Sequence, residues 1–331
     1  MESPMRRRHF MSLLGGTAFS TGLFKPVTVQ AARKLPHVNF VAVGFGADTS
    51  AFDAIRDELR RLGEVEGRTF SIGLWASDDL SRAPELAREI VQSSPDVILS
   101  INTRIVPALQ SLTQRIPIVV AFTGDPVALG FTTSRTRPSG NVTGVEDFQD
   151  ALIGKRFELV KALIPTTKRI GILCERGNVG HALVLQSARD AAPSLSLELL
   201  ALDVQSTNDI GRLLDRLPGT PIDALIVVSS PLILSQERAI IQAELALKLP
   251  AIHDLTFEVH DGALAAYGSD PGLNFERAAQ YVDRLLHGAR VADLPFDQPT
   301  YIKLAFNLNT ARTLALTIPP SLLARADEVI E

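Results

Sequence analysis

The chain contains few residues whose type and spacing could carry out catalysis. Its one cysteine, Cys174, lacks a neighbouring motif that would mark a nucleophile, so a partly buried, inert thiol is expected. The six histidines show no paired spacing of the kind found in zinc sites, and His253 and His260 are seven positions apart. The patterns G-x-S-x-G, S-x-x-K and a phosphate loop are absent from the sequence. The sequence therefore predicts no catalytic residues, no metal site and no cofactor, and a protein that is not an enzyme.

Among cofactor-binding motifs, the sequence comes closest to the dinucleotide-binding loop. Gly44 and Gly46 follow an apolar run, but Thr49 stands where the third glycine of G-x-G-x-x-G would be. No acidic residue ends the next apolar run, which leads into Trp75. A tight turn beside a ligand cleft explains these glycines better than a nucleotide site does.

Polar side chains gather where the expected strands end. Each of them, taken alone, is an ordinary cap or turn residue, because Ser, Thr, Asn and Asp favour those positions. In an open parallel sheet, however, ligands bind outside the carboxyl ends of the strands. Two such sheets that face each other would bring these residues to one cleft. The predicted ligand-binding residues are Phe45, Asp48, Trp75, Asn102, Thr103, Thr123, Asp125, Asn178, Ser229, Ser230, Asp254 and Tyr267.

The chemistry of this set suits a small solute. Helix N-termini at the cleft would favour a carboxylate or another anion, and the carboxylate of Asp125 or Asp254 could bind an ammonium group. Aromatic side chains at the same strand ends could hold an apolar group: Phe45, Trp75, Phe122 and Tyr267. For Trp75 and Tyr267, packing at the rim of the site is the alternative role.

The elements that would position these residues recur in two series. Apolar, β-branched runs typical of buried strands begin near residues 38, 69, 96, 116 and 142, and again near residues 169, 195, 224, 249 and 263. Helical spacing of apolar residues follows most of them, as at Phe52, Ile55 and Leu59. The strand starts have nearly the same spacing in the two series. They therefore predict an α/β fold of two similar Rossmann-like lobes, each with a parallel sheet.

The stretch 116–147 closes the first series. Its strand Ile116–Phe122 ends in the turn Thr123–Pro126, and the glycine-bounded piece Gly140–Val145 could be an edge strand. A new helical pattern then starts at Ile153. This stretch thus supplies a candidate ligand loop and begins the passage into the second series.

The remainder, residues 270–331, is too short for a third domain. It holds a helical pattern over Leu273–Leu286, an extended piece over Tyr301–Leu308, and further helix between Leu314 and Ile330 that Pro319-Pro320 interrupts. We expect this tail to cross back to the first lobe and then to return to the second.

The predicted domain organisation follows from these passages. Lobe 1 would comprise residues 37–147 and 270–297, and lobe 2 residues 148–269 and 298–331. Several crossovers between two lobes would form a hinge.

The first 31 residues have the order of an export signal. Arg6–Arg8 is basic, Leu13–Phe24 is apolar but shorter than a membrane span of about 20 residues, and small residues precede Ala32. The segment Arg7-Arg8-x-Phe10-Met11 resembles a twin-arginine signal. A lipoprotein anchor is excluded, because no cysteine lies near the cleavage point. We predict that residues 1–31 are a signal peptide cleaved near Ala31 and that the mature protein is periplasmic.

Length and composition fit two globular lobes. A chain of 331 residues is about right for two domains, and 46% hydrophobic with 21% charged residues is ordinary for a globular protein. The net charge of −4 argues against nucleic acid as a partner, which would require a basic surface. A small molecule is therefore the expected ligand.

Four segments resemble those of one bacterial family. They are Asp125-Pro126-Val127, Arg137–Gly144, the pair Pro299-Thr300 with Asn307–Ala311, and the ending Ile318–Ile330. On these segments the chain is similar to the ABC-transporter substrate-binding proteins, and among them to the tryptophan/tyrosine-binding periplasmic proteins. The resemblance covers essentially the whole chain.

The resemblance implies a type I periplasmic-binding-protein fold, in which two Rossmann-like lobes joined by three crossovers close on a ligand. It also implies a monomer that delivers its ligand to an ABC permease in the inner membrane. The loops Cys174–Asn178 and His253–Thr256 depart from the family's usual pattern. The resemblance therefore leaves the solute open, with an amino acid or an aromatic or carboxylate solute as candidates.

Two other classes of function remain as alternatives. The first is a ligand-binding sensor or regulator on the same fold, without transport; a regulator that reads DNA would need a helix-turn-helix ahead of Val38, where the export signal stands instead. The second is an enzyme of doubly wound fold, which would need a catalytic set that the sequence does not contain.

Overall fold

Apolar, β-branched runs form the strands of two separate sheets. The computed structural model describes residues 34–44, 50–77, 79–101, 103–298 and 301–331. Leu35–Glu331 is one compact unit that contains both sheets. The predicted signal peptide lies outside the described residues.

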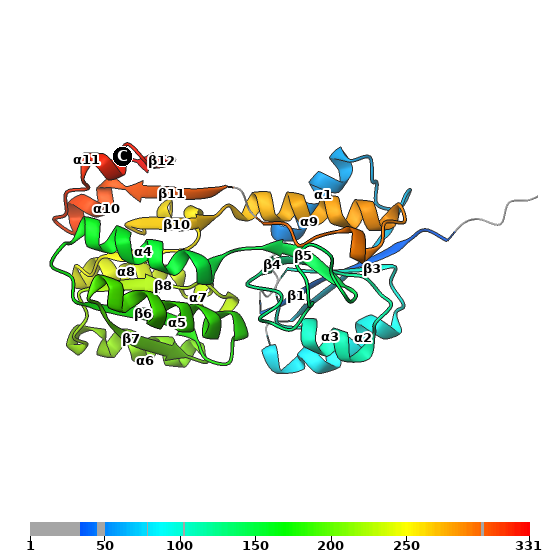
Figure 1. Cartoon of the computed structure of the whole chain (residues 1–331), viewed down its shortest axis with the longest axis horizontal. Coiled ribbons are helices and arrows are strands. Elements are labelled where there is room, and N and C mark those ends of the chain that lie inside the picture. Colours follow the sequence, from blue (N-terminus) through cyan, green and yellow to red (C-terminus); the bar gives the residue numbers. More distant parts are fainter. Residues whose placement is uncertain (1–33, 45–49, 78, 102, 299–300) are drawn as a thin grey trace, which may run out of the picture. The chain divides into compact units, whose positions relative to one another are not determined.

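In the described part of the chain, the first sheet consists of five parallel strands in the order β2-β1-β3-β4-β5 (Figure 1). These strands are β1 (His37–Val43), β2 (Ser71–Ser77), β3 (Val97–Ser100), β4 (Ile118–Thr123) and β5 (Val142–Glu146). The helices that cover them are α1 (Ser50–Arg61), α2 (Ala83–Gln92), α3 (Val106–Leu112) and α9 (Pro271–Leu286). Side chains alternate between the faces of a strand. Phe40 therefore packs with α1 and α9, whereas Val41 packs with α2 and α3.

Among the described residues, seven strands form the second sheet, in the order β12-β11-β10-β9-β8-β6-β7. Only β11 and β10 pair antiparallel there; every other pair of neighbours is parallel. The strands are β6 (Arg169–Glu175), β7 (Glu198–Val204), β8 (Ala224–Val227), β9 (Ala251–His253), β10 (Ala265–Ser269), β11 (Ile302–Asn307) and β12 (Glu328–Ile330).

Helices pack on both faces of the second sheet. On one face, Phe157 of α4 (Gln149–Leu163) and Val184 of α5 (Val179–Ala191) pack with Ile172. On the other face, Leu213 of α6 (Thr207–Arg216) packs with Leu173. Helices α7 (Pro231–Leu234) and α8 (Glu237–Leu247) add to this second face. None of the helices in the described ranges is long and apolar enough to cross a membrane.

Both sheets share one strand order. The order β7-β6-β8-β9-β10 in the second sheet repeats the order β2-β1-β3-β4-β5 in the first. This repetition confirms the predicted fold class of two α/β lobes built on parallel sheets. In each sheet the order reverses at the first strand of the series, between β1 and β3 and between β6 and β8, and such a reversal opens a ligand crevice at the carboxyl ends of the strands.

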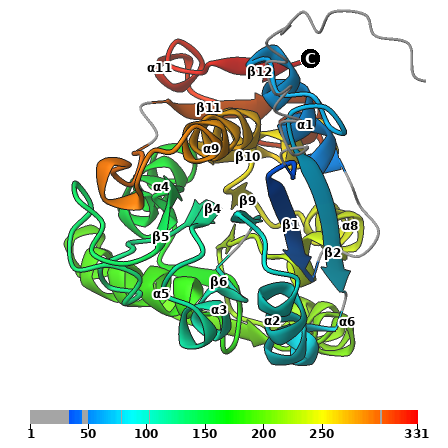
Figure 2. The same cartoon turned by 90° about the vertical axis from the view of Figure 1, so that its right-hand side faces the viewer.

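The tail connects the two sheets. Helix α9 contacts α1, β3, β4 and β5, and Thr143 of β5 donates its hydroxyl to the carbonyl of Leu294 at 2.7 Å. Strand β11 instead pairs with β10, so the tail ends in the second sheet (Figure 2). The boundaries predicted for the two lobes stay a prediction.

The predicted helix between Leu314 and Ile330 is mostly wrong. The structure places α10 (Leu308–Thr313) earlier, a single helical turn at α11 (Pro320–Leu323), and the strand β12 at the end. Pro320 occupies the first position of α11, where its missing N–H costs no hydrogen bond, so the proline begins a helix rather than interrupting one. β12 forms because β11 offers it a free edge.

Candidate functional site

A cavity of about 540 Å³ lies at the carboxyl ends of strands from both sheets. From the first sheet, the lining includes residues that follow or end β1, β3, β4 and β5: Gly44, Thr103, Thr123 and Asp147. From the second, it includes residues that follow β6, β8, β9 and β10: Asn178, Ser229, Leu255 and Pro271. The volume is that of a small-molecule site, and the location is where α/β sheets bind ligands.

The twelve residues predicted for the ligand site fall into three groups. Five of them line this cavity: Thr103, Thr123, Asn178, Ser229 and Ser230. Three lie outside the described residues: Phe45, Asp48 and Asn102. The other four, Trp75, Asp125, Asp254 and Tyr267, are absent from the lining. Contact with a ligand stays a prediction for all of them.

Asp125 holds the turn that follows β4. Its Oδ1 accepts hydrogen bonds from the backbone N–H groups of Val127 at 2.8 Å and Ala128 at 3.1 Å. Its Oδ2 lies 2.8 Å from Nη2 of Arg135. These contacts explain an aspartate at this position without a ligand.

Trp75 and Tyr267 pack against the cores of their own sheets. Trp75 lies with the apolar cluster on the α2–α3 face of the first sheet, and Tyr267 with the α4–α5 face of the second. The packing role is thus the one that the structure supports for both aromatic rings.

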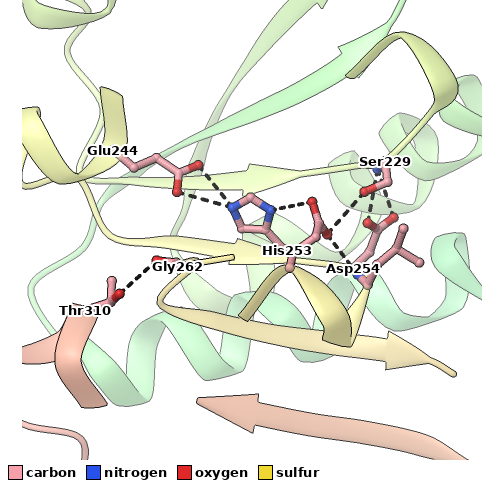
Figure 3. A network of polar contacts seen from close by, with 8 residues as sticks. Ser229, Glu244, His253, Asp254, Gly262 and Thr310 are labelled. Atoms are coloured by element: carbon pink, nitrogen blue, oxygen red, sulfur yellow. Dashed lines mark hydrogen bonds and ion pairs between the residues drawn. The ribbon is translucent and has the colours of Figure 1, made fainter. Parts of the chain in front are cut away.

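Asp254 lies behind the wall of the cavity, with 1% of its surface exposed. Its two carboxylate oxygens accept hydrogen bonds from the backbone N–H of Ser229, at 3.1 and 3.0 Å (Figure 3). A buried carboxylate needs such donors. Asp254 therefore fixes the backbone of a residue that lines the cavity.

His253 is the centre of a buried polar network beside this wall (Figure 3). Its Nε2 lies 3.1 and 3.2 Å from the carboxylate oxygens of Glu244, and its Nδ1 lies 2.9 Å from Oε1 of Glu258. Burial lowers the pKa of His253, but the charges of Glu258 and Glu244 outweigh burial and raise it well above its usual value. The ring is therefore an imidazolium at neutral pH. The other oxygen of Glu258 accepts hydrogen bonds from the N–H of Leu255 at 3.2 Å and the hydroxyl of Ser229 at 3.4 Å.

His181, which the sequence prediction missed, lines the cavity as a neutral ring. Its Nδ1 accepts a hydrogen bond from the N–H of Glu175 at 2.8 Å, so the proton lies on Nε2, which donates to the carbonyl of Ser229 at 3.2 Å. Burial lowers the pKa of His181 to about 4. Asn178, the N-cap of α5, accepts from the N–H of His181 at 3.4 Å. An asparagine at this position is favoured as a helix N-cap, and this is the sequence signal that could have pointed to His181 in the first turn of α5.

The acidic residues of the described lining are Asp147 and Glu237, and none of the described lining residues is Lys or Arg. Burial raises the pKa of each to about 7. For Asp147, the nearby charge of Asp254 raises the pKa further, whereas a hydrogen bond from the backbone N–H of Gln149 opposes the rise. Once ionised, these two groups favour a cationic ligand group. The sequence prediction missed both, because Asp147 lies in the crossover before α4 and Glu237 begins α8.

Arg156 is the buried cation beneath this crossover, with 0% of its surface exposed. Its Nε donates to the carbonyl of Tyr267 at 2.9 Å, and its Nη1 to the carbonyl of Gln149 at 3.4 Å. Burial lowers the pKa of Arg156, and the charges of Asp254 and Asp147 oppose that effect. The guanidinium therefore balances acidic groups near the cavity and joins α4 to β10.

An ion pair joins the two walls of the cleft. Arg104 follows β3 in the first sheet, and Glu175 is the last residue of β6 in the second. Their side chains form an ion pair, and the carboxylate of Glu175 is buried.

Apolar groups make up much of the remaining lining. The rings of Phe122 and Phe275 meet edge to face with centroids 5.2 Å apart, and Phe257 is 40% exposed. The buried hydroxyl oxygen of Thr123 has no hydrogen-bond partner within the described chain. A buried hydroxyl usually finds a partner, so Thr123 offers a polar contact next to an aromatic surface.

Cys174 is buried and inert in this structure. Its thiol lies 3.2 Å from Oδ1 of Asp203, to which it donates, and burial raises its pKa to about 12. The thiol therefore stays protonated at neutral pH, as the sequence analysis expects.

Comparisons with known proteins agree with this architecture. The pattern of the family described as ABC transporter substrate binding protein matches residues 41–330. A tyrosine-binding protein of Clostridioides difficile (strain R20291) is 28% identical over 239 residues, which are 72% of this chain and 68% of that protein.

Solved structures are similar as well. A conserved domain protein from Vibrio cholerae matches with a TM-score of 0.82 and 26% identity, covering 89% of this chain and 100% of its own. A protein from Streptococcus pneumonia solved in complex with L-Trp matches with a TM-score of 0.80, 24% identity and coverage of 90% and 100%, which shows the fold alone. The family match spans nearly all of the described chain and agrees with the two sheets and their shared cavity. This chain belongs to the family of ABC transporter substrate-binding proteins.

Proposed function

We propose that this protein is the periplasmic solute-binding component of an ABC importer. In this proposal, residues 1–31 direct export and are cleaved near Ala31, and the mature protein delivers its solute to a permease. The family match supports this role. The observation that carries it is the cavity, whose walls come from the carboxyl ends of both sheets. A ligand that touches both walls stabilises the closed arrangement of two lobes, which is how hinge proteins capture solutes.

We infer further that the solute is an amino acid with an apolar or aromatic side chain. Asp147 and Glu237 would bind its ammonium group, and Phe122 and Phe275 its side chain. The N-terminus of α5, which lines the cavity, would attract its carboxylate. The similarity to a tyrosine-binding protein supports the same class of solute.

A thermal-shift and calorimetric screen tests this inference. It compares L-tryptophan, L-tyrosine and L-phenylalanine with matched amines that lack the carboxylate and matched carboxylic acids that lack the amine. Amino acids are expected to raise the melting temperature most, and the acids least, because they have no group for Asp147. If a sugar stabilises the protein while no amine-bearing compound does, the inferred class is wrong.

Two further measurements test the rest of the proposal. Mass spectrometry of the protein from the native periplasm should give an N-terminus at or close to Ala32, and intact Met1 on cytosolic protein would contradict export. The bound solute should be recovered chemically unchanged after denaturation, and a converted product would instead indicate an enzyme.

A further inference from the structure

A second cluster of polar side chains lies at the end of α9 that is far from the cavity. Helix α9 begins beside the cavity at Pro271 and ends at Leu286, with His287 as its C-cap. At a rise of 1.5 Å per residue, the twelve steps from Phe275 to His287 span about 18 Å. The cluster consists of Asp283 and His287, one helical turn apart, and Glu64, which follows α1.

The ligand-type atoms of the three side chains converge. One atom from each, two carboxylate oxygens and a ring nitrogen, lie within 4.8 Å of one another. Nε2 of His287 is 3.7 Å from Oε1 of Glu64, and Nδ1 is 3.4 Å from Oδ1 of Asp283. These distances are longer than hydrogen bonds but place all three groups around one small volume.

The histidine ring is oriented for a metal. Its Nδ1–H donates to the backbone carbonyl of Asp283 at 2.9 Å. The lone pair of the neutral ring is therefore on Nε2, on the side of Glu64. Metal-binding histidines are commonly fixed by such a bond from the other ring nitrogen.

Glu64 brings a largely buried side chain to the cluster. Only 8% of its surface is exposed, and its Oε1 lies 3.7 Å from Nε2 of His287. A carboxylate with so little access to water is stabilised by a cation beside it. The negative end of the α9 dipole also favours a cation here.

We propose that Glu64, Asp283 and His287 bind one divalent transition-metal ion, with Zn²⁺ as the expected metal. One imidazole nitrogen and two carboxylate oxygens form a donor set that suits Zn²⁺, whereas Ca²⁺ and Mg²⁺ prefer oxygen donors alone. Water would complete the coordination, because the ring of His287 is exposed. The ion would tie the segment after α1 to the C-terminal end of α9, and so brace two helices that cover the first sheet.

Calorimetric titration of ZnCl₂ into metal-free, tag-free protein without solute tests this site. Wild type is expected to bind one ion per chain, and His287→Gln at least tenfold more weakly. His260→Gln is the matched control: His260 is also exposed and also pairs with a glutamate, Glu328 at 2.7 Å. The control should bind Zn²⁺ as wild type does.

A spectroscopic readout separates coordination from a general loss of charge. Co²⁺ added to wild type should give visible absorption bands of a ligand field that includes nitrogen, and His287→Gln should lose them. Equal Zn²⁺ binding by wild type and His287→Gln, or equal losses in His287→Gln and His260→Gln, would overturn the proposal. Because no solute is present, failure here leaves the solute-binding proposal unaffected.

Discussion

At the scale of single residues, the cavity combines acidic groups with an apolar surface. Burial raises the pKa of Asp147 to about 7, above the value near 4 of an aspartate in an unfolded chain. Between those two values, the folded protein holds a proton that the unfolded chain has released. The contribution of Asp147 to the free energy of unfolding therefore falls as the pH rises from about 4 to 7. Asp147 is a partly buried acid that destabilises the empty protein at neutral pH, and the ammonium group of a solute would offset that effect.

The substitution Asp147→Asn should separate stability from binding. We expect affinity for an amine-bearing solute to fall about tenfold to a hundredfold, because a charge-assisted hydrogen bond contributes roughly 1.5–3 kcal/mol. We also expect the solute-free variant to be more stable than wild type, by more at pH 8 than at pH 5. Urea unfolding at the two pH values and calorimetry measure these effects.

Asp150→Asn is the control for Asp147→Asn. It removes the same charge from the same segment, but Asp150 does not line the cavity. Its affinity should remain close to that of wild type. Normal affinity in Asp147→Asn would show that the ammonium group binds elsewhere.

The candidate residues were predicted from the sequence in part. Thr123 and Ser229 were found because parallel strands end in polar turns that meet at one edge. Asp254 also follows the end of a strand. Its carboxylate, however, accepts hydrogen bonds from the N–H of Ser229, and the sequence alone does not reveal this contact. Asp147 and His181 were missed since they lie beyond the strand ends, in a crossover and in the first turn of a helix.

At the scale of elements, buried ions connect α8 and β9 to the wall of the cavity. His253 of β9 carries a positive charge between Glu244 of α8 and Glu258 of the following helical turn. Because the pKa of His253 is raised in the folded protein, its contribution to stability is complete below about pH 6.5. That contribution is lost only as the pH rises through the higher folded-state value.

His253→Gln should therefore be strongly destabilising at neutral pH. Removing one partner of a buried ion pair costs about 3–5 kcal/mol, and here two carboxylates would remain with 4% and 1% of their surfaces exposed. Urea unfolding at pH 7 measures the loss. The exposed His260→Gln should change the free energy of unfolding by less than about 0.5 kcal/mol. A small effect of His253→Gln would mean that the glutamates are protonated and the network is neutral.

Elements were easiest to predict where burial is complete. The run Ala224–Val227 is apolar on both faces, as parallel strands are, and it was predicted to start at the residue where β8 begins. β12 was not predicted, because three residues, Glu328–Ile330, carry too little pattern and depend on the edge of β11. The resemblance to a known family supplied the overall architecture that these local patterns alone leave open.

At the scale of the whole molecule, the Arg104–Glu175 pair links the two sheets outside the lining of the cavity. An interaction that favours the closed arrangement strengthens the binding of every solute by one factor. We expect Arg104→Gln to weaken affinity roughly tenfold to a hundredfold for each solute tested, because it leaves the buried Glu175 without this cation. Calorimetry with two different solutes measures the loss of affinity for each, and the two losses should be equal.

Arg176→Gln is the matched control for Arg104→Gln. Arg176 is adjacent to Glu175, but its side chain is mostly exposed. Its Nη2 lies 3.5 Å from Oδ2 of Asp203 in β7, so this ion pair stays within the second sheet. Its loss should change affinity little. Factors that differ between solutes in Arg104→Gln would instead indicate that Arg104 contacts the solute directly.

The position of α9 in the chain has a consequence for how the protein is made. The helix covers β3 and β4 of the first sheet, yet more than a hundred residues, including the strands β6 to β10, separate it from β5. A ribosome therefore releases the first sheet well before the helix that buries Phe40 and its neighbours. Nascent chains halted before Pro271 should expose that apolar face to chaperones, and the N-terminal half should reach its final packing only after the C-terminal half has emerged.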